Sequence, residues 1–243
     1  MKRSLWVGAL LLGATWAMPV GHANLAERFV VQADGARAVA YPAQAGVENK
    51  APVVYLHGIC GQPDRGCDAF AADATKLGPF VCPVANTTCE GGAHSWGGSA
   101  SAKLDTVDKA MALVAAHTNG ALDVGRAGIL VGFSQGAYAS MQLIHARPGR
   151  FRALYLVGAN ITLDPDKLSA LGVTRVVLAA GRYDGTYKNM QKAVAAIGEG
   201  VRGFEARFVD LGAVGHTYVP ADDRVEAVHE AWAWLDQADE VAD

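Results

Sequence analysis

The chain has 243 residues, of which 51% are hydrophobic, with 28 glycines and a formal net charge of −3. This composition excludes an intrinsically disordered chain and a fibrous repeat protein. No basic stripe runs through the sequence, so nucleic acid is not an expected partner.

The first 23 residues have the pattern of a secretory signal peptide. Lys2 and Arg3 form a positively charged n-region, and Leu5 to Ala17 is an apolar, uncharged h-region. A cleavage region with small residues ends at Ala23. Cleavage after Ala23 would leave a chain with a net charge of −5. Because the longer uncharged run from Ser4 to Gly21 contains three glycines and a proline, it would make a poor membrane-spanning helix. We therefore predict an exported protein, periplasmic or secreted, with no stable membrane anchor and one domain over 24–243.

The four cysteines, Cys60, Cys67, Cys82 and Cys89, fall within one stretch of 30 residues. An even number of cysteines in an exported chain indicates two disulfides. A metal site is the weaker interpretation, since no pair has the C-x2-C spacing of a structural zinc site. Three pairings are open, and the sequence alone does not choose among them. The local pairing, 60–67 with 82–89, is slightly favoured.

Apolar segments with strand and helix patterns follow one another along the chain and predict an α/β class. The predicted strands are 28–32, 37–41, 52–56, 79–84, 129–131, 153–157, 175–179 and 204–211. The predicted helices are 68–77, 103–117, one that ends near 146, 164–171, 187–197 and one that spans 225–235. The segment 158–172 is too short for a lid domain, so we expect an open site above the sheet.

The most informative stretch joins a buried strand to a helix through a G-x-S-x-G sequence over 132–136. A strand that turns at once into a helix strains its middle residue, and side chains two positions away on either side would collide. The glycines allow this turn, which would hold the hydroxyl of Ser134 above the sheet. The N–H of Gln135 and the helix N-terminus would lie beside it. This favours a nucleophile over a serine that merely caps the helix.

A second turn follows the predicted strand 52–56. The sequence there is His57-Gly58-Ile59, and Gly58 lets the backbone turn so that the N–H of Ile59 points above the sheet. An oxyanion hole needs two preorganised donors of this kind. Taken alone, this would be an ordinary glycine turn. Together with the serine turn, it predicts Ile59 and Gln135 as the two oxyanion donors.

Two further residues complete a catalytic arrangement. Asp184 comes directly after the predicted strand 175–179, and His216 follows the last predicted strand. A serine hydroxyl is too weakly acidic to attack an ester unaided. A histidine can take its proton, and a carboxylate can hold the imidazole in the correct tautomer. The order Ser134, Asp184, His216 therefore predicts a catalytic triad.

Other residues of the same types fit less well. Asp164 and Asp166 lie in a short connecting segment, and Asp210 lies inside a predicted strand. His94 precedes the serine in a glycine-rich loop and ranks below His216. Trp96, in the same loop, either lines a substrate pocket or packs the loop onto the domain, and both interpretations stay open.

Four motifs in this order resemble the landmarks of a known family. They are YLHG at 55–58, GFSQG at 132–136, AGRYD at 180–184 and VGH at 214–216. The sequence resembles the small, lidless α/β-hydrolases of the phospholipase/carboxylesterase (acyl-protein-thioesterase-like) and dienelactone hydrolase branches. The resemblance implies a mostly parallel sheet of about eight strands flanked by helices, without a large lid domain.

The resemblance also implies roles for single residues. Ser134 would be the nucleophile, Asp184 the acid and His216 the base, with Ile59 and Gln135 as oxyanion donors. We therefore predict a serine hydrolase that cleaves carboxylic esters through an acyl-enzyme and needs no metal or organic cofactor.

Three alternatives to an esterase remain. They are a peptidase or amidase with the same triad, a polyester depolymerase, and a non-catalytic binding protein on a hydrolase scaffold. The substrate's acyl chain length and the oligomeric state are not predicted.

Overall fold

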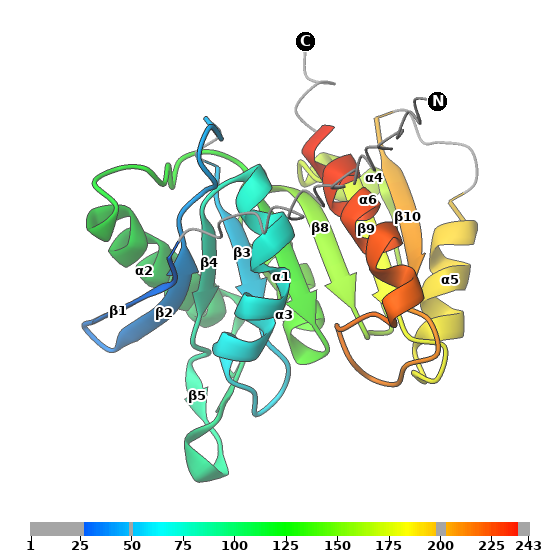
Figure 1. Cartoon of the computed structure of the whole chain (residues 1–243), viewed down its shortest axis with the longest axis horizontal. Helices are drawn as coiled ribbons and strands as arrows, with labels where there is room; N and C mark the ends of the chain where they lie inside the picture. Colours follow the sequence, from blue (N-terminus) through cyan, green and yellow to red (C-terminus); the bar gives the residue numbers. More distant parts are fainter. Residues whose placement is uncertain (1–26, 49–50, 198–202, 238–243) are drawn as a thin grey trace, which may run out of the picture.

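The computed structural model describes residues 27–48, 51–197 and 203–237 (Figure 1). The predicted signal peptide, 1–23, lies outside the described residues. A large sheet runs through the middle of the described part, and helices cover both of its faces, as Figure 1 shows. This is the α/β architecture that the alternating strand and helix patterns predict.

The large sheet has eight strands in the order β1-β2-β4-β3-β7-β8-β9-β10. β1 pairs with β2, and β2 with β4, in antiparallel register, whereas every other neighbouring pair is parallel. The predicted opening hairpin and a mostly parallel sheet of about eight strands are therefore confirmed. The strands are β1 (Phe29–Ala33), β2 (Ala36–Tyr41), β3 (Val53–Leu56), β4 (Phe80–Pro83), β7 (Gly128–Phe133), β8 (Phe151–Val157), β9 (Arg175–Ala180) and β10 (Glu205–Asp210).

The helices lie in two layers. α1 and α6 pack on one face of the sheet, and α2, α3, α4 and α5 pack on the other. Their bounds are α1 (Pro63–Leu77), α2 (Ala100–His117), α3 (Gln135–Ala146), α4 (Pro165–Ala170), α5 (Tyr187–Ala195) and α6 (Val225–Asp236). Within the described residues, the segment between β8 and β9 holds only the six-residue α4, which leaves no room there for a lid domain.

Side chains of the central strands alternate between the two layers. Along β8, Leu154 and Leu156 face the α2–α5 side, whereas Tyr155 and Val157 face α1 and α6. All seven residues of β8 are buried, as expected of a parallel strand covered on both faces. This two-sided burial holds the strand ends in place, and the loops that follow the strands carry the candidate site.

The disulfides differ from the favoured local pairing. Cys60 bonds to Cys89, and Cys67 bonds to Cys82, so the prediction of 60–67 with 82–89 is wrong. The cause is helix α1, which begins at Pro63 rather than at residue 68. Cys67 therefore lies on the sheet-facing side of the helix against β4, while Cys60 stays in the loop that precedes the helix. None of the four cysteines has a free thiol.

The predicted long loop 86–98 also contains more structure than expected. It forms a small antiparallel pair, β5 (Thr87–Thr88) with β6 (His94–Ser95), and a single 3-10 turn, η1 (Glu90–Gly92), lies between the two strands. Figure 1 shows this hairpin projecting below the sheet, on the side where the parallel strands end. The Cys60–Cys89 bond ties it to the loop after β3.

The Cys67–Cys82 bond is expected to contribute strongly to stability. Both residues are fully buried, and the bond closes a separation of 15 residues between α1 and β4. In the double variant Cys67→Ala/Cys82→Ala, we expect the free energy of unfolding to fall by about 2–4 kcal/mol. Thermal unfolding without reductant, followed by circular dichroism, measures this. In reductant the difference from the wild type should shrink, and an unchanged Tm without reductant would contradict the expectation.

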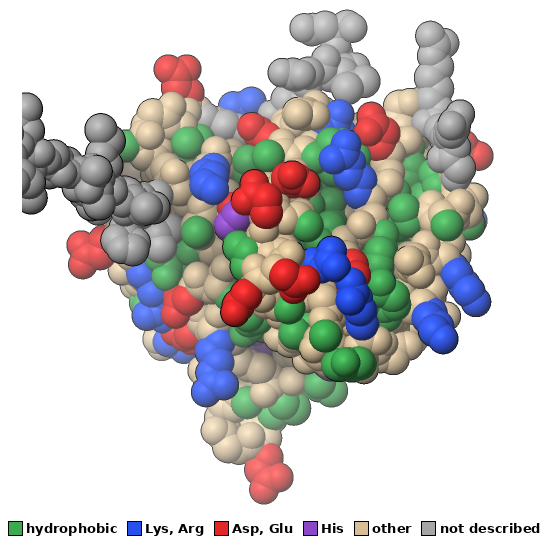
Figure 2. Space-filling view, turned by 45° about the vertical axis from the view of Figure 1, so that its right-hand side comes forward, with side chains coloured by type: hydrophobic (Ala, Val, Ile, Leu, Met, Phe, Trp, Pro, Cys, Tyr) green, Lys and Arg blue, Asp and Glu red, His purple; other side chains and the backbone are tan. Residues whose placement is uncertain are grey.

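On the face drawn in Figure 2, acidic and basic side chains are interspersed rather than gathered by sign. In the part of the chain that the structure describes, no helix combines the length and the apolar character needed to cross a membrane.

Candidate active site

Ser134 occupies a sharp turn between β7 and α3. Its φ of +53° is rare for a residue with a side chain, and α3 starts at the next residue. The Ser134 N–H donates to the carbonyl of Val157 at 2.8 Å, which fixes the turn to the end of β8. A non-glycine residue held in this conformation at a strand–helix junction is typical of an exposed nucleophile.

The two glycines of the motif have the steric role that the sequence predicts. A Cβ on Gly132 would come within 2.6 Å of the backbone of Ala137, in the first turn of α3. A Cβ on Gly136 would come within 1.9 Å of the carbonyl oxygen of Leu56, at the end of β3. Any side chain at either position would therefore push the helix away from the strand ends.

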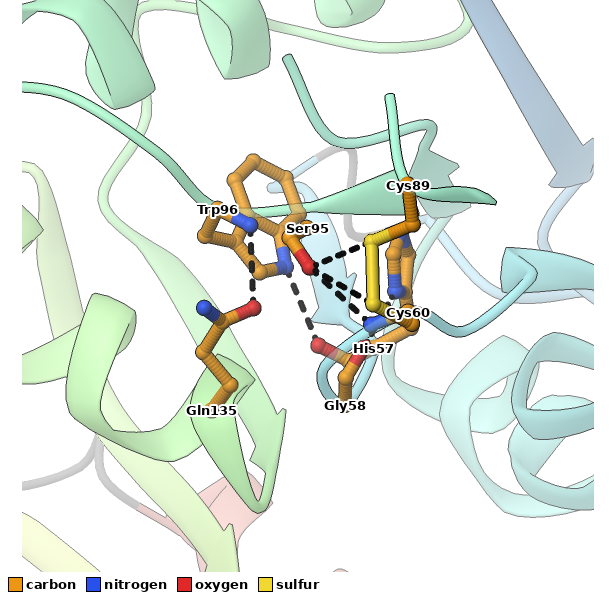
Figure 3. The surroundings of a disulfide bond; sticks show 7 residues. All are labelled: His57, Gly58, Cys60, Cys89, Ser95, Trp96 and Gln135. Atoms are coloured by element: carbon orange, nitrogen blue, oxygen red, sulfur yellow. Dashed lines mark hydrogen bonds between the residues drawn. A yellow bond between two sulfur atoms is a disulfide. The ribbon is translucent and has the colours of Figure 1, made fainter. Parts of the chain in front are cut away.

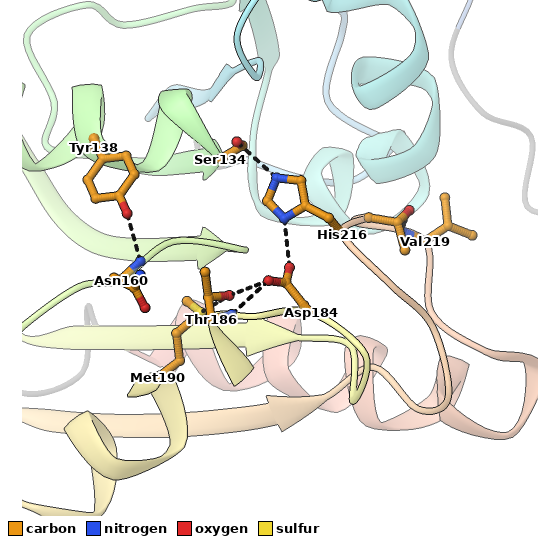
Figure 4. A network of polar contacts seen from close by, with 9 residues as sticks. Ser134, Tyr138, Asn160, Asp184, Thr186, Met190, His216 and Val219 are labelled. Atoms are coloured by element: carbon orange, nitrogen blue, oxygen red, sulfur yellow. Dashed lines mark hydrogen bonds and ion pairs between the residues drawn. The ribbon is translucent and has the colours of Figure 1, made fainter. Parts of the chain in front are cut away.

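The structure brings Ser134, His216 and Asp184 into one hydrogen-bonded line (Figure 4). The Oγ of Ser134 lies 3.0 Å from Nε2 of His216, and Nδ1 of His216 lies 2.7 Å from Oδ2 of Asp184. A carboxylate can only accept, so Nδ1 carries the proton and Nε2 is free to accept from the serine hydroxyl. The three residues follow β7, β10 and β9, which end at the same edge of the sheet.

Asp184 is held as an anion by its surroundings. Only 7% of the residue is exposed, and its Oδ1 accepts hydrogen bonds from the N–H and the Oγ1 of Thr186 at 2.8 and 2.9 Å. Burial alone would raise the pKa of Asp184, but the hydrogen bonds from Thr186 and His216 outweigh it and lower that pKa below its ordinary value. The carboxylate is therefore ionised at neutral pH and can orient the imidazole.

The loops that carry Asp184 and His216 are joined to each other. The N–H of Arg182 donates to the carbonyl of Gly212 at 2.8 Å, and the N–H of Tyr183 donates to that of Val214 at 3.0 Å. The guanidinium of Arg182 also pairs with Asp210, the last residue of β10. These backbone hydrogen bonds between the two loops thus fix the distance between Asp184 and His216.

Gly158 is a residue of the site that the sequence analysis missed. It follows β8 with a φ of +64°, and a Cβ there would lie 2.9 Å from Cε1 of His216 and 3.2 Å from Oδ2 of Asp184. Its missing side chain leaves room for the histidine–aspartate pair. A glycine directly after a buried strand was the available signal, but one glycine among 28 does not stand out.

The loop after β3 lies against the turn at Ser134. A Cβ on Gly58 would come within 3.1 Å of the Phe133 ring and 3.5 Å of the Ser134 Cβ. Ile59 follows with its side chain 64% exposed, and Gln135 is the first residue of α3. Among the described residues, no protein acceptor takes a hydrogen bond from the N–H of Ile59 or Gln135. Both predicted oxyanion donors are therefore available on the two sides of the serine.

His57 holds the backbone of that loop by hydrogen bonds, a role that was not predicted from the sequence. It is 1% exposed, its Nδ1–H donates to the carbonyl of Gly58 at 2.8 Å, and its Nε2 accepts from the N–H of Ala85 at 3.2 Å. Burial lowers the pKa of His57, so the ring stays neutral. This histidine uses both ring nitrogens to hold the backbone and is not a second base.

Trp96 packs the loop instead of lining a pocket. It is 3% exposed, and its indole N–H donates to the carbonyl of His57 at 3.0 Å. Its backbone N–H donates to Oε1 of Gln135 at 3.0 Å, which holds the Gln135 side chain toward Trp96 (Figure 3). Its burial and these two hydrogen bonds favour packing of the loop over a substrate pocket.

The Cys60–Cys89 bond completes this support (Figure 3). The N–H of Cys60 donates to Oγ of Ser95 at 3.0 Å, and the backbones of Gly61 and His94 exchange two hydrogen bonds. The hairpin β5–β6 is thereby fixed beside the loop after β3. His94 serves this bridge, in agreement with its low rank as a base.

The competing carboxylates have other partners. Asp164 caps α4 by accepting from the N–H of Lys167 at 3.2 Å, and Asp166 lies in the first turn of the same helix. Asp210 accepts from the guanidinium of Arg182. Within the described ranges, no group of three or more His, Cys, Asp or Glu side chains has an arrangement that could hold a metal ion.

Searches for related proteins find likeness in structure only. No protein-family profile and no curated protein sequence matches the chain. Among solved structures it is similar to the esterase PE8, with a TM-score of 0.59 and 23% identity over 81% of this chain and 97% of that one. It is also similar to a carboxylesterase from Mesorhizobium loti, with a TM-score of 0.57 and 18% identity over 85% and 98% of the two chains.

A third similar structure, DphMB1, has a TM-score of 0.64 and 18% identity over 89% of this chain and 86% of that one. The mostly parallel sheet, the two helical layers and the absence of a large lid among the described residues agree with these likenesses. The chain therefore has the fold of the α/β-hydrolase superfamily.

Proposed function

We propose that the protein is an exported serine hydrolase of the carboxylesterase type, with a single domain over 24–243. The observation that carries this proposal is the unbroken line from Ser134 through His216 to Asp184, with contacts of 3.0 and 2.7 Å. Its likeness to esterases of known structure supports the same activity. Two disulfides are compatible with an oxidising compartment outside the cytoplasm.

The geometry supports a two-step reaction. The Oγ of Ser134 attacks the ester carbonyl while Nε2 of His216 takes its proton, and the N–H groups of Ile59 and Gln135 hold the oxyanion. The tetrahedral intermediate collapses to an acyl-enzyme when His216 gives that proton to the departing alcohol. Water then attacks the acyl group by the same route, and the acid and free Ser134 are released.

Asp184 remains an anion throughout this reaction. It keeps the proton on Nδ1 of His216 and stabilises the imidazolium that forms in each step. The low pKa of Asp184 suits this role, because a carboxyl group that took up the proton would no longer stabilise the charge. No step requires a metal or an organic cofactor.

A polyester depolymerase is the second candidate, because exposed apolar side chains surround the site. Each of these side chains lies in a segment that carries a proposed residue of the site. The exposed fractions are 64% for Ile59, 76% for Tyr183, 53% for Val219 and 44% for Tyr138. Figure 4 shows Val219 and Tyr138 on either side of the line from Ser134 to Asp184. A flat, insoluble ester surface could reach such a site.

One experiment compares three substrates: 4-nitrophenyl butyrate, the matched butyryl 4-nitroanilide, and an insoluble aliphatic polyester emulsion. We expect turnover of the ester with kcat/KM at least about 100-fold above the anilide, since the anilide has the poorer leaving group. Equal or faster anilide hydrolysis would favour an amidase, and clearing of the emulsion would favour the depolymerase. A folded protein inactive on all three would contradict the proposal and favour the binding protein.

A further inference from the structure

A cavity of about 710 Å³ opens beside the nucleophile. Ile59, Phe133 and Tyr218 are among the residues that line it. The Phe133 ring lies 4.9 Å from the ring of His216 and 5.0 Å from that of Tyr218, measured between centroids. One side of an ester bound at Ser134 would therefore extend along these rings into the cavity.

Two arginines also line this cavity. Arg37 comes from β2, and Arg65 comes from the first turn of α1. Within the described ranges neither guanidinium forms an ion pair, whereas at least six of the eleven arginines in those ranges do. A cation left unpaired in a cavity is available to a ligand of opposite charge.

The remaining titratable groups of the cavity do not cancel these charges. Asp64 also lines it and pairs with Arg28, which lies 3.4 Å from Asp68 as well, so three arginines face two carboxylates there. His57 is neutral, and burial raises the pKa values of Tyr55 and Tyr218, so both phenols stay protonated. Arg65 lies close enough to Tyr218 to oppose part of that increase. The cavity is therefore positive in a chain whose net charge is negative.

Helix α1 adds to this field. It begins at Pro63 beside the cavity, is 15 residues long, and its N-cap residue Gln62 provides no side-chain hydrogen bond to the first turn. The N-terminal end of a helix carries partial positive charge and favours anions. The helix end and the two guanidinium groups thus act on the same space.

We propose that this cavity is a subsite for a carboxylate of the substrate, which makes the preferred substrates esters that carry a free carboxylate, such as monoesters of dicarboxylic acids. The inference rests on the proposed esterase function and adds the substrate class. Arg65 and Arg37 would bind the carboxylate by charge-assisted hydrogen bonds, and Tyr218 would donate its hydroxyl to the same group. The rings of Phe133 and Tyr218 would contact the linking carbons.

The test uses two matched pairs of esters, since either side of the ester bond could enter the cavity. One pair is mono-4-nitrophenyl glutarate with 4-nitrophenyl pentanoate, and the other is 3-carboxyphenyl butyrate with 3-carbamoylphenyl butyrate. In one of the two pairs, we expect kcat/KM for the charged ester to be more than about five times that for its neutral partner. This ratio should decrease as the salt concentration rises. In Arg65→Gln and Arg37→Gln that ratio should fall about five- to twentyfold.

Arg126→Gln is the matched control, because it removes the same charge from an exposed position that does not line the cavity. It should keep the wild-type ratio. A wild-type ratio near one in both pairs, or a ratio unchanged by both cavity variants, would overturn the subsite while leaving esterase activity intact. No turnover of any of the four esters by the folded protein would overturn the esterase function, and the subsite with it.

Discussion

Replacing Ser134 by Ala is expected to lower kcat for ester hydrolysis by about 10⁴-fold or more. The Oγ of Ser134 is the group that His216 Nε2 faces at 3.0 Å, and alanine leaves the base without a nucleophile to activate. The fold should survive, because the turn is held by backbone hydrogen bonds such as that from the Ser134 N–H to Val157. Initial rates with 4-nitrophenyl butyrate and circular dichroism measure the two effects.

Ser140→Ala is the matched control for this experiment. Ser140 lies on α3, six positions further along the chain, and its Oγ donates to the carbonyl of Gly136 rather than to the site. We expect Ser140→Ala to keep kcat within about threefold of the wild type, at a stability cost of about 1 kcal/mol for the lost hydrogen bond. If Ser134→Ala kept more than about a tenth of wild-type activity, Ser134 would not be the nucleophile.

Replacing Asp184 by Asn is expected to lower kcat by about 10²- to 10⁴-fold. The amide fills the same space but can present its N–H₂ to Nδ1 of His216, which favours the wrong imidazole tautomer and removes the stabilising charge. KM should change much less than kcat, because Asp184 lies behind the histidine and contacts His216 and Thr186 rather than bound ester. Steady-state kinetics separates the two parameters.

Two other carboxylates provide the comparison for Asp184. Asp164→Asn weakens the cap of α4, and Asp210→Asn breaks the pair with Arg182 near the acid loop. We expect less than about a threefold loss of kcat for Asp164→Asn, and a loss for Asp210→Asn that stays below that of Asp184→Asn. If either variant were more damaging than Asp184→Asn, the acid of the triad would have been misassigned.

The acid sensitivity of folding offers a second readout for Asp184. The pKa of Asp184 is lower in the folded protein than its ordinary value. The ionised carboxylate therefore stabilises the fold at every pH above the ordinary pKa. That contribution is lost as the pH falls through the lowered pKa. In Asp184→Asn this part of the pH dependence should be absent, and the difference in Tm from the wild type should shrink as the pH is lowered below about 4.

Much of the site could be predicted from local sequence. The strand–turn–helix around Ser134 is encoded within a dozen residues, because a short aliphatic run predicts a buried strand and the two glycines allow a tight turn after it. Asp184 and His216 were predicted from their positions after strands, since parallel strands present their carboxyl ends at one edge. The structure places all three side chains within hydrogen-bond distance in this arrangement.

Features that depend on contacts distant in sequence were missed or wrong. The cysteine pairing follows from where α1 begins, and a five-residue error in that helix boundary was enough to favour the wrong bonds. The support that His57 and Trp96 give to the loop after β3 joins three segments that no local pattern connects. Gly158 is needed only because His216, 58 residues later, packs against it.

The measurement that tests the central claim most directly is labelling of the mature, folded protein with a fluorophosphonate probe, followed by peptide mapping. An activated serine attacks such a probe, whereas an ordinary serine does not. The result expected is one adduct, on Ser134, that is lost in Ser134→Ala and strongly slowed in Asp184→Asn. A folded protein that gains no adduct, or gains it on another serine, would contradict the assignment of Ser134 as the nucleophile.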